Sequence, residues 1–178
     1  ATTWYHVFVI KRTDTNVVDV YFDSSVTAAN IPTSYTLYRR IGSVKTNGSS
    51  QIIAFTQDGD YITLTTPVLE TTSATPGTSA VTQTLANVPT GVNVRAILTV
   101  VSTAGMHAIL SDLVTTDAAP SNTVSPLHNV GTDFGSSTIG GQVVIRTNTS
   151  AQIRTRNTAN TQLFITTNGW VDARGRNN

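Results

Sequence analysis

The chain has 178 residues, a formal net charge of +1 and no Cys, and charged residues make up only 12% of it. The absence of Cys excludes disulfides, thiolate metal sites and cysteine nucleophiles. A nearly neutral chain has no strong field to attract nucleic acid or an anionic membrane surface, and no apolar run approaches the roughly 18–20 residues of a transmembrane helix. We therefore expect neither nucleic acid nor membrane insertion among its interactions.

Turn signals recur about every 8–12 residues along the chain, the spacing of a β-sandwich or barrel. β-Branched residues dominate and Glu70 is the only Glu, so propensity also favours strands throughout. Asn47-Gly48 predicts a two-residue type I′ turn, and Asp58-Gly59 predicts a second tight turn. The strands predicted in chain order are residues 4–10, 17–22, 35–44, 51–55, 61–64, 80–85, 92–103, 106–114, 142–147, 151–156 and 162–167.

Two stretches interrupt this pattern. Residues 65–79 contain Pro67 and Pro76 and predict a long connection, with a weak domain boundary at 66–79. Residues 115–137 form the longest non-periodic stretch and are a candidate binding loop. We identify no internal repeat. The expected fold is therefore all-β, an antiparallel β-sandwich of jelly-roll type, forming one module over residues 1–178. Since the chain lacks an initiator Met, we interpret it as the C-terminal part of a longer protein.

Four segments carry a family resemblance: WYHVFVI, TSYTLYRRIGSVKT, FTQDGDYI and GWVDARGR. In this order they resemble a module near the C-termini of bacteriophage tail-fibre and related virion structural proteins. The resemblance touches about half of the residues, and its motifs describe strands and turns. It implies a location in the virion, on the tail or another surface appendage of the extracellular particle. It also implies an elongated parent fibre, a homotrimer and contacts with other virion proteins.

The last of these segments holds the most distinctive candidate site. Trp170 is suited to stack on a sugar ring, and equally suited to anchor the chain end in the core or in a subunit interface. Asp172 and Arg174 would form a same-face pair, and Arg176 would add a second cation beside them. We favour the anchoring interpretation and keep these four residues as candidate ligand contacts.

A second group of candidates is basic or lies in the long loop. Arg154 and Arg156 share one face of a predicted strand, with Ile153 opposite, and could bind phosphate or acidic sugars or pair with Asp residues. His128 and Asn129, in the stretch 115–137, are candidates for exposed ligand contacts. We favour a structural or interface role for the arginines.

Two further constellations are better explained by structure than by ligand binding. For Arg39-Arg40, we expect one Arg in solvent and the other paired across the sheet. Asp58-Gly59-Asp60 supplies too few oxygens for a hard cation and fits a tight turn. His6 lies in an aromatic strand and is expected to be a core or interface residue. We assign no metal ligand and no cofactor.

No catalytic residue can be assigned either. The chain lacks a Gly-x-Ser-x-Gly elbow, and pairing His128 with Asp133 and a Ser would be arbitrary. Glycan cleavage usually needs two facing carboxyl groups, and this chain has one Glu and ten acidic residues in all. We expect a non-catalytic virion appendage module that trimerises and binds bacterial surface polysaccharide or lipopolysaccharide. The alternatives are a purely structural baseplate, head-fibre or decoration protein and, third, a receptor-degrading glycan hydrolase.

Overall fold

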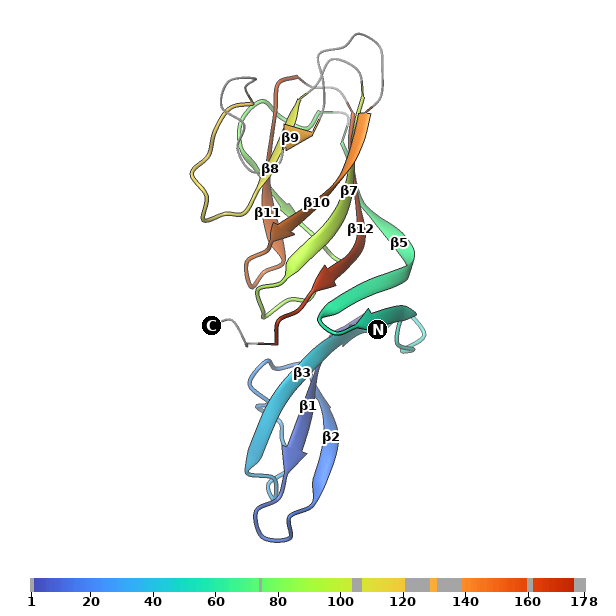
Figure 1. Ribbon diagram of the computed structural model, residues 1–178, viewed down its shortest axis with the longest axis vertical. Helices are drawn as coiled ribbons and strands as arrows, with labels where there is room; N and C mark the ends of the chain where they lie inside the picture. Colours follow the sequence, from blue (N-terminus) through green and yellow to red (C-terminus); the bar gives the residue numbers. More distant parts are fainter. Residues whose placement is uncertain are drawn as a thin grey trace.

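The computed structural model describes residues 2–73, 75–103, 107–120, 129–130, 139–159 and 162–174. Within these residues the regular elements are β-strands in three antiparallel sheets, as the all-β prediction requires. None of the described segments is a helix long and apolar enough to cross a membrane. Figure 1 shows a smaller lobe built on β1, β2 and β3 below a larger lobe that contains the other sheets. We call residues 2–54 the N-terminal lobe and residues 55–174 the C-terminal lobe.

The N-terminal lobe is a three-stranded sheet in the order β2-β1-β3. β1 (Trp4–Lys11) and β2 (Val18–Asp23) form the predicted hairpin, and β3 (Leu37–Lys45) pairs with the other edge of β1. One face of the sheet is covered by the connection 24–36. Under it lie Phe8, Ile10 and Ala28, with Tyr21, Ile31 and Tyr35 packed against them. This lobe therefore has a small hydrophobic cluster of its own.

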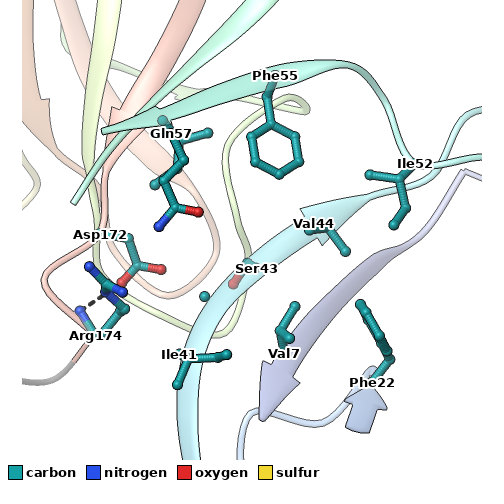
Figure 2. A pocket seen from close by; sticks show the side chains of 12 residues that line it. Val7, Phe22, Ile41, Ser43, Val44, Ile52, Phe55, Gln57, Asp172 and Arg174 are labelled. Atoms are coloured by element: carbon teal, nitrogen blue, oxygen red, sulfur yellow. Dashed lines mark hydrogen bonds between the residues drawn. The ribbon is translucent and has the colours of Figure 1, made fainter. Parts of the chain in front are cut away.

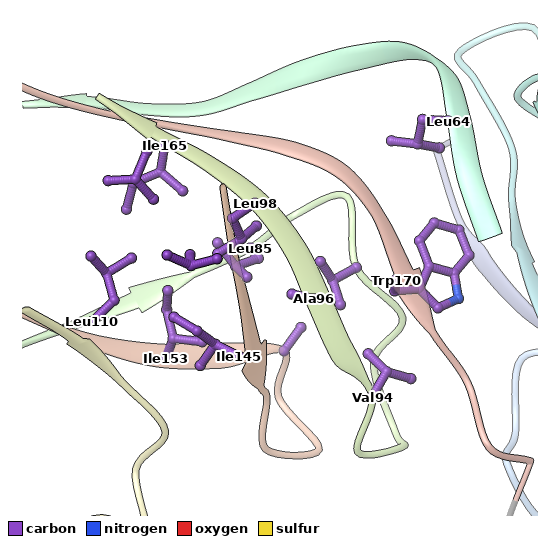
Figure 3. Close-up of a cluster of buried hydrophobic side chains, with 14 of the residues drawn as sticks. Leu64, Leu85, Val94, Ala96, Leu98, Leu110, Ile145, Ile153, Ile165 and Trp170 are labelled. Carbon is purple, nitrogen blue, oxygen red and sulfur yellow. The ribbon is translucent and has the colours of Figure 1, made fainter. Parts of the chain in front are cut away.

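The C-terminal lobe contains a five-stranded and a four-stranded sheet, in the orders β10-β7-β12-β5-β4 and β6-β11-β8-β9. Alternate residues of both sheets point into one shared hydrophobic cluster (Figure 3). Leu98 and Ile165 enter it from the five-stranded sheet, and Leu110 and Ile153 from the four-stranded sheet; each is fully buried. The strands are β4 (Phe55–Asp58), β5 (Tyr61–Ser73), β6 (Val81–Thr84), β7 (Arg95–Ser102), β8 (Ala108–Ser111), β9 (Asn129–Val130), β10 (Ile139–Arg146), β11 (Gln152–Asn157) and β12 (Leu163–Val171).

The predicted connection 65–79 is largely a strand. β5 continues to Ser73 and pairs with β12 over most of that length. Pro67 is compatible with this because β4 pairs with β5 only as far as Leu64, so the later part of β5 is a sheet edge on that side. Residues 66–73 of the predicted boundary 66–79 therefore lie inside a strand, and the two hydrophobic clusters separate near residues 46–54.

The last predicted strand, residues 162–167, ends too early. β12 extends to Val171 and lies between β5 and β7, where Trp170 pairs with Ile62 and Ala96. Gly169 makes this possible, since a Cβ there would lie 2.0 Å from the carbonyl oxygen of Ile62. One of the two register shifts in the β12–β5 pairing, between Thr167 and Gly169, lies at this close approach.

The turn at Asn47-Gly48 differs from the prediction as well. A type I′ turn needs a positive φ at Asn47 and Gly48, but the positive φ in this turn belongs to Ser50, at 61°. Thr46 forms an isolated bridge with Ile52, and residues 51–54 do not belong to a named strand. At the second predicted turn, Gly59 does adopt a positive φ of 56°, between the paired residues Asp58 and Tyr61.

Candidate functional site

A group of buried charged and polar side chains lies where the two lobes meet. Arg40 of β3 places its guanidinium against the carboxylate of Asp172, which follows β12 directly. The distance from Arg40 Nη1 to Asp172 Oδ1 is 3.1 Å, and Nη2 donates to Oδ2. Their side chains are only 13% and 3% exposed. A charge pair that is bidentate and withdrawn from water is strongly oriented, so this contact fixes the C-terminal end of β12 on β3.

His6 and Ser43 complete the same group, which we call the junction cluster (His6, Arg40, Ser43 and Asp172). Arg40 Nε donates to His6 Nδ1 at 3.2 Å, and Arg40 Nη2 donates to Ser43 Oγ at 2.6 Å. Since Nδ1 accepts from Arg40, the imidazole proton belongs on Nε2, and the Ser43 hydroxyl also donates to Nδ1, at 2.9 Å. Burial and the neighbouring Arg40 lower the pKa of His6 to about 4. The imidazole is therefore neutral near pH 7.

The junction cluster contains Ser, His and Asp but has a different geometry from a catalytic triad. In a triad the carboxylate binds the imidazole and orients it toward the serine. Here Asp172 binds Arg40, and Arg40 donates to the imidazole nitrogen that faces Ser43. With a pKa of about 4, His6 is a weak base at neutral pH. The arrangement orients and fixes four side chains rather than activating a nucleophile.

Arg174 extends this network to the turn between β4 and β5. Its Nη2 donates to Asp60 Oδ1 at 2.5 Å and to the Gly59 carbonyl at 3.0 Å. Its backbone N–H donates to Asp172 Oδ1 at 2.9 Å. The predicted pairing of the Asp172 and Arg174 side chains is thus replaced by two separate ion pairs, Arg40–Asp172 and Arg174–Asp60. The prediction failed because Arg40 comes from a distant part of the sequence.

A second set of contacts joins the lobes around Ala86 and Asn87. Lys45 of β3 donates to the carbonyl of Ala86 at 2.9 Å and to Asn87 Oδ1 at 2.7 Å, and Trp4 Nε1 donates to the same carbonyl at 3.3 Å. Glu70 accepts from the backbone N–H groups of both residues, at 2.8 and 2.9 Å. Burial lowers the pKa of Lys45, and the nearby Glu70 opposes this effect. The only Glu of the chain therefore serves to hold a turn.

Trp170 is an anchor in this structure. It is 1% exposed and packs edge-on against Trp4, with ring centroids 5.4 Å apart and planes at 82°. A ring this deeply buried has no free face to stack on a sugar, so its position agrees with the favoured anchoring interpretation and not with the sugar-platform alternative. Asp172, at 3% exposure, is likewise engaged inside the protein.

Arg154 and Arg156 do share one face of β11, while Ile153, Thr155 and Asn157 are buried on the other. Both arginines hold neighbouring loops. Arg154 Nη1 donates to the carbonyl of Thr115 at 2.5 Å, and Arg156 Nη1 pairs with Asp117 at 2.6 Å. Both guanidinium groups therefore already interact with acceptors of this chain.

The remaining predicted site residues do not belong to the junction cluster, apart from Arg40. The backbone of Asn129 pairs with Ile109 in the short strand β9. His128 and Arg176 lie outside the residues that the structure describes. Of the Arg39-Arg40 pair, Arg39 is exposed, as predicted for one of the two, but Arg40 pairs with Asp172 instead of across its own sheet.

Beside the junction cluster lies a hollow of about 250 Å³, shown in Figure 2. Phe22, Val44 and Ile52 line it from the N-terminal lobe, and Phe55, Asp172 and Arg174 line it from the C-terminal lobe. Its apolar side belongs to the N-terminal sheet, and its polar side belongs to the end of β12 and the residues that follow. The alternation of apolar residues along β1 and β2 was visible in the sequence, but the meeting of these two lobes was not.

Comparisons with known proteins add no assignment. No family of known proteins, no curated protein and no solved structure matches this chain.

Proposed function

We propose that the chain is a non-catalytic module of a virion appendage of the phage tail-fibre type, which assembles as a homotrimer and binds a bacterial surface glycan. The four sequence segments named above support the virion location. The observation that carries the proposal is the junction cluster, in which Arg40, Asp172, His6 and Ser43 bind one another across the two lobes. In the junction cluster, reactive side chains bind one another and hold the two lobes together. This arrangement suits a structural module that transmits force and keeps its shape.

The finer fold assignment belongs to the same proposal. The two sheets of the C-terminal lobe share one hydrophobic cluster, which is the arrangement of a β-sandwich, and we assign it the jelly-roll type. The loops at the ends of a closed sandwich can vary while the packing of the core between the two sheets stays the same. Loops on a rigid β scaffold are common ligand-binding sites.

Binding would depend on several weak sites acting together. Three copies on one fibre present three polar surfaces to a repetitive glycan, and linkage raises the overall affinity by about 10²–10⁴ over a single site. The loop held by Arg154 and Arg156 is our candidate contact region, because these partly buried cations place residues 113–117 at the surface of β11.

The test is an adsorption and glycan-binding experiment with the purified chain. We expect it to bind bacterial polysaccharide or lipopolysaccharide on an array, and to block adsorption of particles that carry the same appendage. Arg156→Ser should weaken binding, whereas Arg12→Ser should not. The two are matched, because each removes an Arg paired with one Asp, at 2.6 and 2.7 Å, in different lobes.

Two other outcomes separate the alternatives. A chain that neither binds cells nor blocks adsorption, while the whole appendage does, would leave a purely structural virion component. Release of reducing ends from host polysaccharide would identify a glycan hydrolase.

A further inference from the structure

The two lobes contain the same turn. Residues 46–52 read Thr-Asn-Gly-Ser-Ser-Gln-Ile, and residues 147–153 read Thr-Asn-Thr-Ser-Ala-Gln-Ile. In the first turn, Asn47 Oδ1 accepts from the backbone N–H of Ser49 and Gln51, at 2.9 and 3.0 Å. In the second, Asn148 Oδ1 accepts from Ser150 and Gln152, at 3.0 and 2.9 Å.

Further contacts agree between the two turns. The side-chain amide of each Asn donates to the side chain of the following Gln, at 3.3 and 3.0 Å. Ser50 and Ala151, at equivalent positions, adopt positive φ angles of 61° and 56°. The sequence pattern and the backbone conformation therefore repeat together, and the expectation that the chain lacks an internal repeat is wrong for this segment.

The repeat includes the strands that lead into each turn. Thr46 donates its backbone N–H to the Thr3 carbonyl at 2.9 Å, and its hydroxyl contacts the same carbonyl. Thr147 does the same to Val94, with distances of 2.9 and 3.3 Å. β1 and β3 in the N-terminal lobe thus correspond to β7 and β10 in the C-terminal lobe.

The registers extend this correspondence along the strands. The pair Tyr5–Val44 matches Ala96–Ile145, and the next pair on the same face, Val7–Gly42, matches Leu98–Val143. The face of the N-terminal sheet that carries Tyr5, Val7 and Val9 therefore corresponds to the face of the C-terminal sheet that carries Ala96, Leu98 and Val100.

These equivalent faces differ in their exposure to solvent. Ala96, Leu98 and Val100 are 0% exposed, because the four-stranded sheet that contains β11 covers them. Ile153, the last residue of the second turn motif, is also 0% exposed, whereas its counterpart Ile52 is 51% exposed. After Ile153 the chain continues along β11, but after Ile52 it leaves for β4 in the other lobe. The covering layer of the first unit is missing from the described part of the chain.

The open face is broad and apolar. It continues from β1 onto β2, because Val20 pairs with Val9 and Phe22 with Val7. We name it the open face and define it by the apolar side chains that share it: Tyr5, Val7, Val9, Val18, Val20, Phe22, Leu37, Val44 and Ile52. Val18, Val20, Phe22, Leu37 and Ile52 are each 47–60% exposed. Together they expose on the order of 450 Å² of apolar surface, as large as the biggest patches on single soluble domains.

We infer that the open face binds a second copy of this chain, and that it is the surface through which the oligomer of the proposed function assembles. The shape of the face favours a copy of itself. Phe22 and Ile52 project between two adjoining hollows of about 250 and 380 Å³, and both residues line each hollow. Apolar side chains and hollows on one patch allow each copy to contact the next one around the threefold axis of the proposed trimer.

The chemistry and size of the face favour the same occupant. Its half nearer the junction, around Tyr5, Val7, Phe22 and Val44, carries no charged side chain of the sheet, whereas Arg39 lies opposite Val9 and Lys11 lies opposite Val18 and Leu37 in the other half. A neutral apolar surface gains most from an equally neutral and apolar partner, and Ile153 already covers such a face within this chain. Its exposed apolar side chains alone supply about half of the roughly 800 Å² per partner of a standard interface.

The test is sedimentation of the whole chain over a concentration series, with two matched variants. Val20→Lys/Phe22→Ser changes two exposed residues of the open face, and Val144→Lys changes a valine on β10 that is 41% exposed. We expect the unaltered chain and Val144→Lys to associate equally. The open-face variant should associate at least about 100-fold more weakly, because charged and polar groups would be desolvated there. Thermal unfolding of each variant establishes that its fold is intact.

A second readout is independent of the affinity. The chain has no Cys, so Val20→Cys introduces a single thiol for a spin label, and labels on neighbouring copies should lie within measurable range. A chain that stays monomeric up to about 100 μM would overturn the inference. An oligomer that persists in the open-face variant, or labels at position 20 that lie out of range of one another in the oligomer of the unaltered face, would overturn this surface but not the proposed function. Failure to bind glycan would remove the adhesive proposal and leave the interface intact.

Discussion

Arg40 and Asp172 lie 132 residues apart in the sequence and form a bidentate ion pair that joins β3 to the end of β12. The side chains are 13% and 3% exposed, so each charge depends on the other for compensation. Around this pair the polar residues at the junction are arranged to hold the two lobes together.

Removing either partner should therefore be costly. We expect Arg40→Ala or Asp172→Ala to lower the free energy of unfolding by about 3–5 kcal/mol, because the remaining charge stays buried without its partner. Denaturant titration measures this change. Asp14→Ala is the control, since Asp14 pairs with Arg12 at the surface with a side chain 58% exposed. Equal effects of the buried and exposed changes would contradict this role of the pair.

His6 should make stability depend on pH above the range where most carboxylates titrate. Its pKa is lowered from the ordinary 6.5 to about 4 by burial and by Arg40. Between these values the unfolded chain binds a proton that the folded protein does not, so stability decreases as pH falls. From pH 7 to pH 5 we expect a loss of about 2 kcal/mol from this group. The curve for His6→Gln should be flatter over that window, and parallel curves would show that His6 is not responsible.

Gly169 should tolerate no side chain. Gly169→Ala would place a Cβ 2.0 Å from the carbonyl oxygen of Ile62, which is backbone and cannot turn aside. We expect a loss of about 3 kcal/mol or more, because β12 would have to separate from β5. Gly48→Ala is the matched control. A Cβ at Gly48 meets nothing within 4 Å, so that variant should unfold at the same denaturant concentration or slightly higher.

The two Trp residues provide an optical test of the junction. In Trp4→Phe the remaining fluorophore is Trp170, which is 1% exposed. Its emission should resist acrylamide until the protein unfolds, and should not respond to added glycan. Quenching of Trp170 in the folded protein by a sugar ligand would revive the stacking interpretation. Trp170→Ala should lower stability by about 3–5 kcal/mol, in keeping with the loss of a large core side chain.

Much of the fold is encoded locally. Alternation along residues 4–10 and 17–22 predicts the first hairpin, and the placement of Arg154 and Arg156 on one face of β11 follows from the two-residue period of a strand. The repeated Thr-Asn-x-Ser-x-Gln-Ile motif could also have been found in the sequence, because Asn and Gln bind the backbone and each other within the turn itself. These features depend on neighbours a few residues away.

Other features were decided only by the tertiary structure. The period of a strand shows that residues share a face, but not what covers that face. Ile52 and Ile153 end the same motif, yet only Ile153 is buried, because the chain beyond it stays in the same lobe. Likewise, Arg40 could have paired within its sheet, and only the approach of β12 brings Asp172 to it. The sequence by itself determined the all-β class, the first hairpin and the turn at Gly59, which are set by local conformational preference. The tertiary structure decided the junction cluster and the open face, because both depend on contacts between segments far apart in the chain.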